Sequence, residues 1–497
     1  MSTDDFASRI AAAYASEGAA LELGRGMSGG TVHPEAVVQV PAAMCNRHGL
    51  IAGATGTGKT KTLQLMAEQL SAMGVPVFAA DVKGDLSGLS RPGEPSDRVT
   101  SRATDLGIEW SPKGFPVTFL SLGGIGPGVP VRATVSAFGP QLLAKVMDAN
   151  ETQASSLSLV FRYADDNGLA LLDLADLREV LKFLDSDEGK EELKAIGGLS
   201  TATTGVLLRK IVELEDQGAE AFFGEPELEV ADLLRTTPEG HGVVSCLELA
   251  GVQDKPRLFS TFLMWLLAEL FHDLPEVGDL DKPKLVFFFD EAHLLFSDAS
   301  DAFLDQVTQT VRLIRSKGVG VFFVTQLPDD VPDAILAQLG NRVQHALRAF
   351  TPRDAKALKA AVTTYPNTDD YDLEEDLTQL GTGEAMVTIL SERGRPRLSC
   401  GPDCGRPCRS WPRSRQRRST GRRATARCGR STPRRSTASR HGRSWAPASP
   451  PPQSRPPPPT KPPRRRSRGP NQRLPGRRRR TTTSCWATSS RARAGRW

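Results

Sequence analysis

One stretch constrains this chain more than any other, and it reads Gly53-Ala54-Thr55-Gly56-Thr57-Gly58-Lys59-Thr60. It matches the pattern G-x-x-x-x-G-K-S/T at every fixed position. The glycines let the backbone turn and aim its N–H groups at a phosphate, the lysine adds positive charge, and the threonine hydroxyl is a ligand for Mg²⁺. We therefore predict a phosphate-binding loop, and we count the next residue, Lys61, among the nucleotide-binding residues.

The flanks of this loop carry the pattern that the chemistry needs. A loop of this kind leaves a buried strand and opens a helix whose N-terminal dipole faces the anion. Leu50-Ile51-Ala52 is a short apolar run before the loop, and Leu63, Met66, Ala67 and Leu70 repeat at helical spacing after it. This context argues against a glycine-rich turn that binds nothing.

Charge is distributed unevenly along the 497 residues. Residues 401–497 hold 27 Arg and one Lys against a single acid, a net charge of +27, so the whole-chain charge of +5 leaves −22 for residues 1–400. An acidic body argues against binding nucleic acid by broad surface attraction, and any such contact has to be confined to a channel or patch.

Further apolar runs predict the strands of a mainly parallel sheet in an α/β fold, because helix-length segments separate them. These runs are Val75–Ala80, Val117–Leu120, Leu285–Phe289, Val319–Val324, Arg342–Ala349 and Ala385–Leu390. Before Val319, the residues Phe303, Val307, Val311 and Ile314 form the apolar stripe of a helix.

The remaining segments complete the expected organisation. Residues 1–47 predict an amphipathic helix and an extended approach to the first strand, and residues 137–235 predict a helical insertion. We divide the chain into an N-terminal extension (1–40), a first part of the core (41–136), the helical insertion (137–235), a second part of the core (236–396) and a tail (397–497).

The tail differs in kind, being rich in Arg, Pro, Ser and Gly, so we predict that it is disordered. Two interpretations are a basic arm for nucleic acid and the product of a shifted reading frame, and we favour the second. The tail also holds five of the seven cysteines, so no disulfide framework is indicated. The longest apolar run, Leu258–Phe271, is too short to span a membrane and contains Glu269, so we expect no membrane contact and a cytoplasmic location.

Asp290-Glu291 ends one of the predicted strands and is the second strong signal. In a P-loop ATPase an acid at the tip of a neighbouring strand holds Mg²⁺, which we assign to Asp290 together with Thr60. Glu291 is then placed as the general base for the attacking water. The alternative for both acids is a charge that only complements a helix dipole.

Weaker candidates surround these two signals. Gln326 closes the next strand, where it would reach the γ-phosphate or only satisfy a turn. Arg312 and Arg315 share a helix face, either as solvated charges or as an arginine finger for a neighbouring subunit's nucleotide, and Arg342 and Arg348 are weaker candidates for that task. Three charged residues follow the second strand: Asp81, Lys83 and Asp85. We expect them either to contact the nucleotide or DNA, or only to cap a helix.

Several segments together resemble the bacterial HerA-like branch of the FtsK/HerA ATPases over residues 20–396. They are Asn46–Thr60, Asp81–Asp85, Phe287–His293, Arg315–Gly320 and Thr325-Gln326. The resemblance implies a RecA-like P-loop core, a ring-shaped and hexameric homo-oligomer, and ATP-driven movement along double-stranded DNA. It also leaves a nuclease open as a partner protein. It makes Gln326 the γ-phosphate sensor and Arg315 the trans-acting finger. We expect the N-terminal β-barrel of better-known helicases to be missing, because the stretch before residue 40 is too short for it.

We therefore expect a Mg²⁺-dependent ATPase that translocates or unwinds double-stranded DNA. The alternative is an ATP-driven protein-remodelling or secretion-type motor on the same fold, because a fold does not decide the load. A third possibility is a slowly hydrolysing, nucleotide-gated switch, against which Glu291 argues.

Overall fold

The computed structural model describes residues 3–28, 30–193, 197–296, 299–365 and 372–390. The tail predicted for residues 397–497 lies outside these ranges, so its expected disorder stays a prediction.

A sheet of nine strands forms the centre of the described chain, in the order β11-β10-β3-β9-β8-β4-β7-β5-β6. Neighbouring strands run parallel except for β11, which is antiparallel to β10. The strands are β3 (Gly49–Ala52), β4 (Val77–Asp81), β5 (Val117–Leu122), β6 (Val129–Val131), β7 (Val244–Glu248), β8 (Leu285–Phe289), β9 (Val319–Thr325), β10 (Asn341–His345) and β11 (Ala385–Thr388). Each predicted strand is confirmed, while β6 and β7 were not predicted.

Both faces of the sheet are buried, which explains why its strands read as continuous apolar runs. On β8, Phe287 and Phe289 belong to one core cluster, whereas Val286 and Phe288 belong to the other. Successive side chains of a strand point to opposite faces, so β8 contributes to two cores at once.

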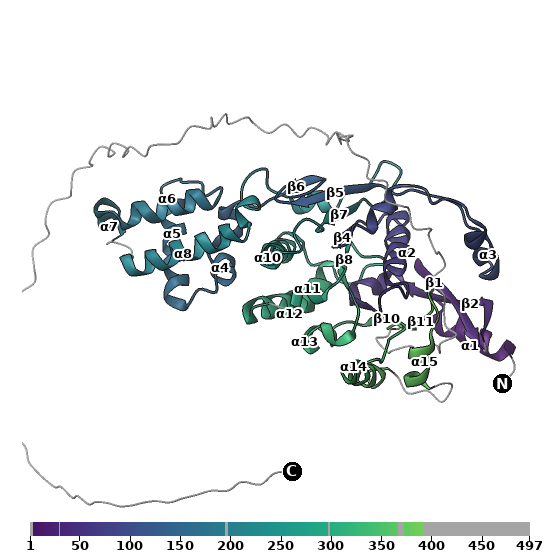
Figure 1. The fold of residues 1–497 in the computed structure, drawn as a ribbon. Coiled ribbons are helices and arrows are strands. Elements are labelled where there is room, and N and C mark those ends of the chain that lie inside the picture. Colours follow the sequence, from purple (N-terminus) through teal and green to yellow (C-terminus); the bar gives the residue numbers. More distant parts are fainter. Residues whose placement is uncertain (1–2, 29, 194–196, 297–298, 366–371, 391–497) are drawn as a thin grey trace, which may run out of the picture. The chain divides into compact units, whose positions relative to one another are not determined.

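Helices cover the two faces separately, and Figure 1 shows α2 and the pair α10 and α12 on opposite sides of β4 and β8. Helix α2 (Lys59–Ala72) packs its apolar stripe into one core cluster. Helices α10 (Pro256–Asp273) and α12 (Asp301–Ile314) pack into the other cluster. The stripe predicted on α12 is buried, from Phe303 to Ile314.

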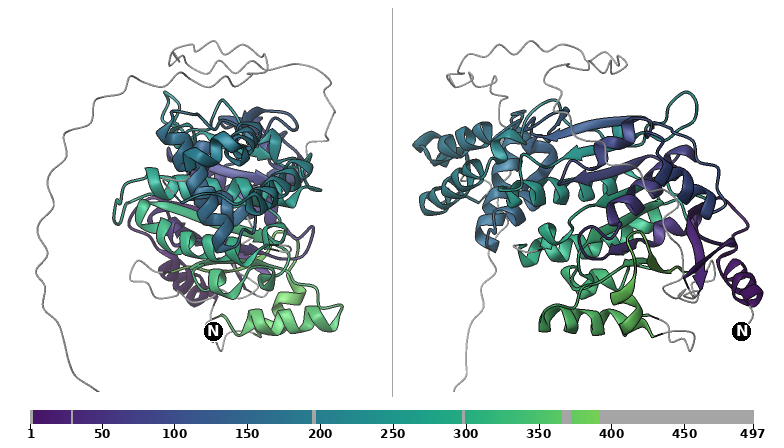
Figure 2. Two further views of the ribbon diagram at one scale, coloured as in Figure 1. Left: turned by 90° about the vertical axis from the view of Figure 1, so that its left-hand side faces the viewer. Right: turned by 45° about the vertical axis from the view of Figure 1, so that its right-hand side comes forward.

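Helices fill the stretch where the sequence predicts a helical insertion, and those labelled α4 to α8 gather in one group in Figure 1, which Figure 2 shows from two further sides. They are α4 (Val135–Val146), α5 (Glu151–Asp166), α6 (Leu174–Asp185), α7 (Asp187–Leu193), α8 (Thr201–Asp216) and α9 (Val230–Leu233). Side-chain caps start four of them, at Thr134, Asn150, Asp173 and Ser200. The domain boundaries drawn from the sequence stay predictions.

The N-terminal segment contains the predicted helix and extended chain, together with a strand pairing that was not predicted. Helix α1 (Thr3–Tyr14) is followed by β1 (Ala20–Ser28) and β2 (Thr31–Pro41), which form an antiparallel pair. A 3₁₀ helix, η1 (Ala42–Arg47), then leads into β3. Gly30 precedes β2 with a φ of +78°, and this glycine is a turn signal that the prediction overlooked.

The remaining elements connect these parts. They are η2 (Leu86–Ser90), α3 (Asp97–Asp105), η3 (Ala219–Ala221), α11 (His293–Phe296), η4 (Arg315–Lys317), η5 (Pro328–Asp330), α13 (Asp333–Leu336), α14 (Pro352–Val362) and α15 (Leu373–Gln379).

Candidate nucleotide site

The loop of residues 53–60 leaves β3 and opens α2, as its flanks predict. The Gly53 backbone N–H donates to the Thr325 carbonyl (3.2 Å), and the Ala54 N–H donates to the Ala346 carbonyl (2.8 Å). These bonds hold the base of the loop against the carboxyl ends of β9 and β10. Its tip, Thr55 and Gly56, is exposed and therefore accessible to a ligand.

Two glycines of the loop are required by geometry. Gly53 has φ +149°, and a Cβ there would lie 2.5 Å from the Cβ of His345. Gly58 has φ +127°, and a Cβ there would lie 3.2 Å from the Cα of Gly383. L side chains rarely adopt such φ values, so the loop keeps this path only with glycine at both positions.

Lys59 is buried at the start of α2, and its Nζ donates to the carbonyl oxygens of Gly53 (2.6 Å) and Ala54 (3.2 Å). Burial lowers its pKa, and the negative charge of Glu291 opposes this shift. Thr60 and Lys61 follow in the first turn and are partly exposed, and Lys61 donates to Gln64 Oε1 (2.8 Å). The first turn of α2 therefore places the positive charge of Lys59 at the N-terminus of the helix, where the helix dipole is also positive.

His345, the last residue of β10, supports the phosphate-binding loop, a role that no sequence pattern indicated. Its Nε2 lies 2.9 Å from the Thr62 hydroxyl, and its Nδ1 lies 2.9 Å from the Glu384 carbonyl. Burial lowers the pKa of His345 to about 4, so the ring is neutral at pH 7. A neutral ring has one N–H, which can donate to the carbonyl while the other nitrogen accepts from the hydroxyl.

Asp290 follows β8 at the same edge of the sheet and is only 4% exposed. Burial raises its pKa to about 7, and the negative charges of Glu291 and Asp81 act in the same direction. Its Oδ2 is buried without a hydrogen-bond partner among the described residues. An orphaned carboxylate oxygen beside a phosphate-binding loop is a suitable ligand for a hard cation such as Mg²⁺.

Glu291 is also 4% exposed, and its backbone φ of +48° is unusual for a residue with a side chain. Such strained backbones cluster at functional sites. Its Oε1 accepts from Lys83 Nζ, and its Oε2 lies 3.4 Å from Gln326 Nε2 and 3.2 Å from His293 Nδ1. Burial would raise the pKa of Glu291, but the hydrogen bond and charge of Lys83 lower it.

The structure therefore brings Lys59, Asp290, Glu291 and Gln326 together at the side of the sheet where the parallel strands have their carboxyl ends. We call this side the carboxyl edge. Asp81 shapes the neighbouring turn, because its carboxylate accepts from the backbone N–H groups of Lys83, Gly84, Asp85 and Leu86. Neither carboxylate oxygen of Asp81 is orphaned. The glycine-lined loop, the buried cation and the orphaned Asp290 oxygen fit a nucleotide with Mg²⁺.

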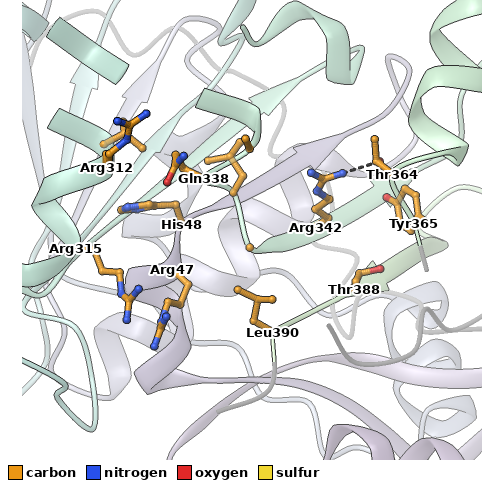
Figure 3. Close-up of a pocket in the computed structure, with 14 residues that line it drawn as sticks. Arg47, His48, Arg312, Arg315, Gln338, Arg342, Thr364, Tyr365, Thr388 and Leu390 are labelled. Carbon is orange, nitrogen blue, oxygen red and sulfur yellow. Dashed lines mark hydrogen bonds between the residues drawn. The ribbon is translucent and has the colours of Figure 1, made fainter. Parts of the chain in front are cut away.

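Arg315 lies at the opposite side of the sheet, where the parallel strands begin, which we call the amino edge. It precedes β9, whereas the loop follows the parallel strand β3. It lines a pocket of about 550 Å³ together with Arg47, Arg312 and Arg342 (Figure 3). Burial lowers the pKa of Arg315, and the Arg47 charge acts in the same direction. The exposed Arg348 lies beyond the carboxyl end of β10 and does not line this pocket.

Comparison with known proteins identifies the family. The family described as "Helicase HerA-like C-terminal" matches residues 29–408. The chain belongs to this family. The probable helicase MJECL08 of Methanocaldococcus jannaschii is 30% identical over 154 residues, which cover 29% of this chain and 28% of that relative. The chain thus matches less than a third of the length of this relative.

Solved structures agree on the fold. The bacterial conjugative coupling protein TrwBdeltaN70 is similar with a TM-score of 0.54 and 15% identity, over 82% of this chain and 93% of the other. The plasmid coupling protein TrwB in complex with ADP and Mg²⁺ has a TM-score of 0.51 and 16% identity, over 81% and 98%. The expected RecA-like P-loop NTPase core is thereby confirmed, and the family supports ATPase activity. No helix in the described ranges is both long and apolar enough to cross a bilayer.

Proposed function

We propose that this protein is a Mg²⁺-dependent ATPase that uses hydrolysis to move along, or to unwind, double-stranded DNA. The observation that carries the proposal is the meeting of the loop 53–60 with Asp290 and Glu291 at one edge of the sheet. Membership of a helicase family supports DNA as the load. The nucleotide and Mg²⁺ in the TrwB complex, a protein of the same fold, support the ligands.

In this proposal each residue at the carboxyl edge has one task. The backbone N–H groups of the loop and Lys59 bind the phosphates, while Thr60 and Asp290 hold Mg²⁺. The bound Mg²⁺ supplies positive charge for the phosphate oxygens. Glu291 accepts the proton of the attacking water, and Gln326, in contact with Glu291, orients that water and the γ-phosphate.

The arginine pocket supports a homo-oligomer, which we propose is a hexameric ring. Arg315 cannot serve the loop of its own chain, since the two lie at opposite edges of the sheet. An arginine that stabilises the transferring phosphoryl group can come from another subunit, and the geometry favours that arrangement. Arg47 and Arg312 line the same pocket and are further candidates, and a nuclease partner stays a proposal from the family resemblance.

We also propose a cytoplasmic location. Cys45 and Cys246 are both free and buried, which is the usual state of cysteines in a reducing compartment.

The test is ATP turnover by the full-length chain with Mg²⁺, measured with and without duplex DNA over a range of salt concentrations. We expect turnover that rises with DNA, falls as salt weakens the DNA contact, and is lost in Lys59→Ala. Turnover that ignores DNA at every salt concentration would contradict the DNA motor and favour the protein-moving alternative. Turnover that survives in Lys59→Ala would contradict the assignment of the loop.

A further inference from the structure

Lys83 contacts the proposed general base directly. Its Nζ donates to Glu291 Oε1 across 208 positions of sequence. The two side chains differ in freedom, because Lys83 is 42% exposed whereas Glu291 is 4% exposed. Glu291 also has an unusual backbone conformation and a second contact with Gln326, so Lys83 is the less constrained member of the pair.

The backbone below Lys83 is fixed, although its side chain is not. Four N–H groups of the turn, from Lys83 to Leu86, donate to the buried Asp81 carboxylate at the end of β4. This anchor presents Lys83 at the same edge as the phosphate-binding loop. The positive charge of Lys83 also lowers the pKa of Lys59, so the two cations act on each other at this edge.

A lysine ammonium on a flexible four-carbon stem can exchange partners, and it follows the stronger anion. A γ-phosphate bears more negative charge than a carboxylate and offers several acceptor oxygens, so its charge-assisted hydrogen bonds compete well with the Glu291 pair. In its pair with Lys83, Glu291 has one oxygen bonded to a cation, and this contact lowers the pKa of the carboxyl group. The pair therefore makes Glu291 a weaker base towards water and leaves it fewer free acceptor sites.

We propose that Lys83 switches between two anions: it binds Glu291 when no γ-phosphate is present and transfers to the γ-phosphate when ATP is bound. Arrival of ATP thereby frees Glu291 to accept a proton from water, and loss of the γ-phosphate restores the resting pair. Lys83 is then the residue that distinguishes ATP from ADP. This inference rests on the proposed function, because it takes residues 53–60 as the ATP loop.

The experiment compares full-length parent protein with Lys83→Ala and Lys83→Arg. Affinities for ADP and for the non-hydrolysable analogue ADPNP are measured by calorimetry with Mg²⁺, and kcat and KM are measured for ATP. Lys182→Ala is the matched control, because Lys182 also pairs with a glutamate (Glu179 Oε1, 2.7 Å) but lies on α6. If Lys83→Ala disturbs folding, Lys83→Gln serves as the second neutral variant.

We expect Lys83→Ala to lose about tenfold in ADPNP affinity, the size of one charge-assisted hydrogen bond, with ADP affinity unchanged. The KM for ATP should rise by a similar factor while kcat changes less than about threefold, because the switch removes Lys83 from Glu291 before the water reacts. Lys83→Arg should retain most of the ADPNP affinity.

Two outcomes would overturn the inference. A large fall in kcat with unchanged ADPNP affinity would make Lys83 a permanent support for Glu291. No change beyond that of Lys182→Ala would make the pair structural only. If the parent itself fails to bind or hydrolyse ATP, the proposed function fails and the switch fails with it, a result that is distinguishable because every other outcome requires an active parent.

Discussion

The two edges of the central sheet differ in the charged groups that they present. At the carboxyl edge, Lys59 lies with the buried acids Asp290 and Glu291 beside the loop. At the amino edge, Arg47, Arg312, Arg315 and Arg342 line one pocket. The carboxyl edge has the groups to which we assign phosphate binding and water activation, whereas the amino edge has a cluster of arginines and no phosphate-binding loop.

The difference teaches that one copy of the chain does not complete the site that we propose. Parallel strands send their two ends to opposite edges, so no movement of a side chain brings Arg315 to the loop of its own sheet. If both edges contribute to hydrolysis, the carboxyl edge of one subunit must meet the amino edge of another. Activity should therefore depend on assembly.

The largest effect is expected for Arg315→Ala at the amino edge. We predict that kcat for ATP falls by about 10³-fold, the lower range for an arginine finger. Nucleotide affinity, measured by calorimetry on the same variant, should change little if the arginine acts mainly in the transition state. Arg162→Ala is the control, because Arg162 is an exposed arginine on α5 that pairs with Asp166. Parent-like turnover in Arg315→Ala would remove the amino edge from the mechanism.

At the carboxyl edge, Glu291→Gln is expected to lower kcat by about 10²-fold or more, since it removes the proposed general base while keeping the shape. ADPNP should still bind, because the loop and Lys59 are intact. Single-turnover measurements separate hydrolysis from product release. A variant that hydrolyses as fast as the parent would instead favour the slow, nucleotide-gated switch.

Acid should destabilise both edges through one buried histidine each. Burial lowers the pKa of His48, before β3, and of His345, after β10, to about 4. A histidine whose folded pKa lies below its unfolded value stabilises the fold above pH 6.5, and this stability is lost as pH falls towards 4. Each contributes up to about 3 kcal/mol. Urea unfolding at pH 7 and pH 5 should show a smaller pH dependence in His345→Gln than in the parent.

A smaller effect on stability is expected within the loop itself. Gly53→Ala places a Cβ against His345 at an unfavourable φ, so we predict a loss of about 1–3 kcal/mol in the free energy of unfolding. Gly56→Ala is the matched control, because φ is also positive there but no atom lies within 4 Å of the added Cβ. Equal losses for the two variants would show that contact with His345 does not determine the requirement for glycine.

The carboxyl edge was predictable from sequence because its signals are local. The motif at residues 53–60 and the acids after the run Leu285–Phe289 each lie within a few residues, next to strands that their apolar patterns reveal. Parallel pairing then brings the ends of those strands together. The roles of these residues stay predictions, although the structure gathers them at one edge.

The amino edge and the supporting contacts were not predictable, because they join distant segments. The sequence named Arg312, Arg315 and Arg342 as candidate fingers, but no pattern showed that they share a pocket or that Arg47 joins them. In the sequence, His345 has the pattern of an ordinary strand residue. The contact between Lys83 and Glu291 forms only because β4 and β8 are neighbours in the sheet, and the sequence did not predict that pairing. Strand β7 was overlooked because Ser245 and Glu248 interrupt its apolar run.

The central claim is that the two edges act together across subunits, and mixed assemblies test it most directly. Lys59→Ala subunits, which keep the amino edge, are co-assembled with Arg315→Ala subunits, which keep the carboxyl edge, and ATP turnover is measured with duplex DNA. The account predicts that the mixture recovers turnover well above that of either variant alone, because some neighbouring pairs combine an intact loop with an intact arginine. Co-assembled subunits with no more turnover than the separate variants would contradict it.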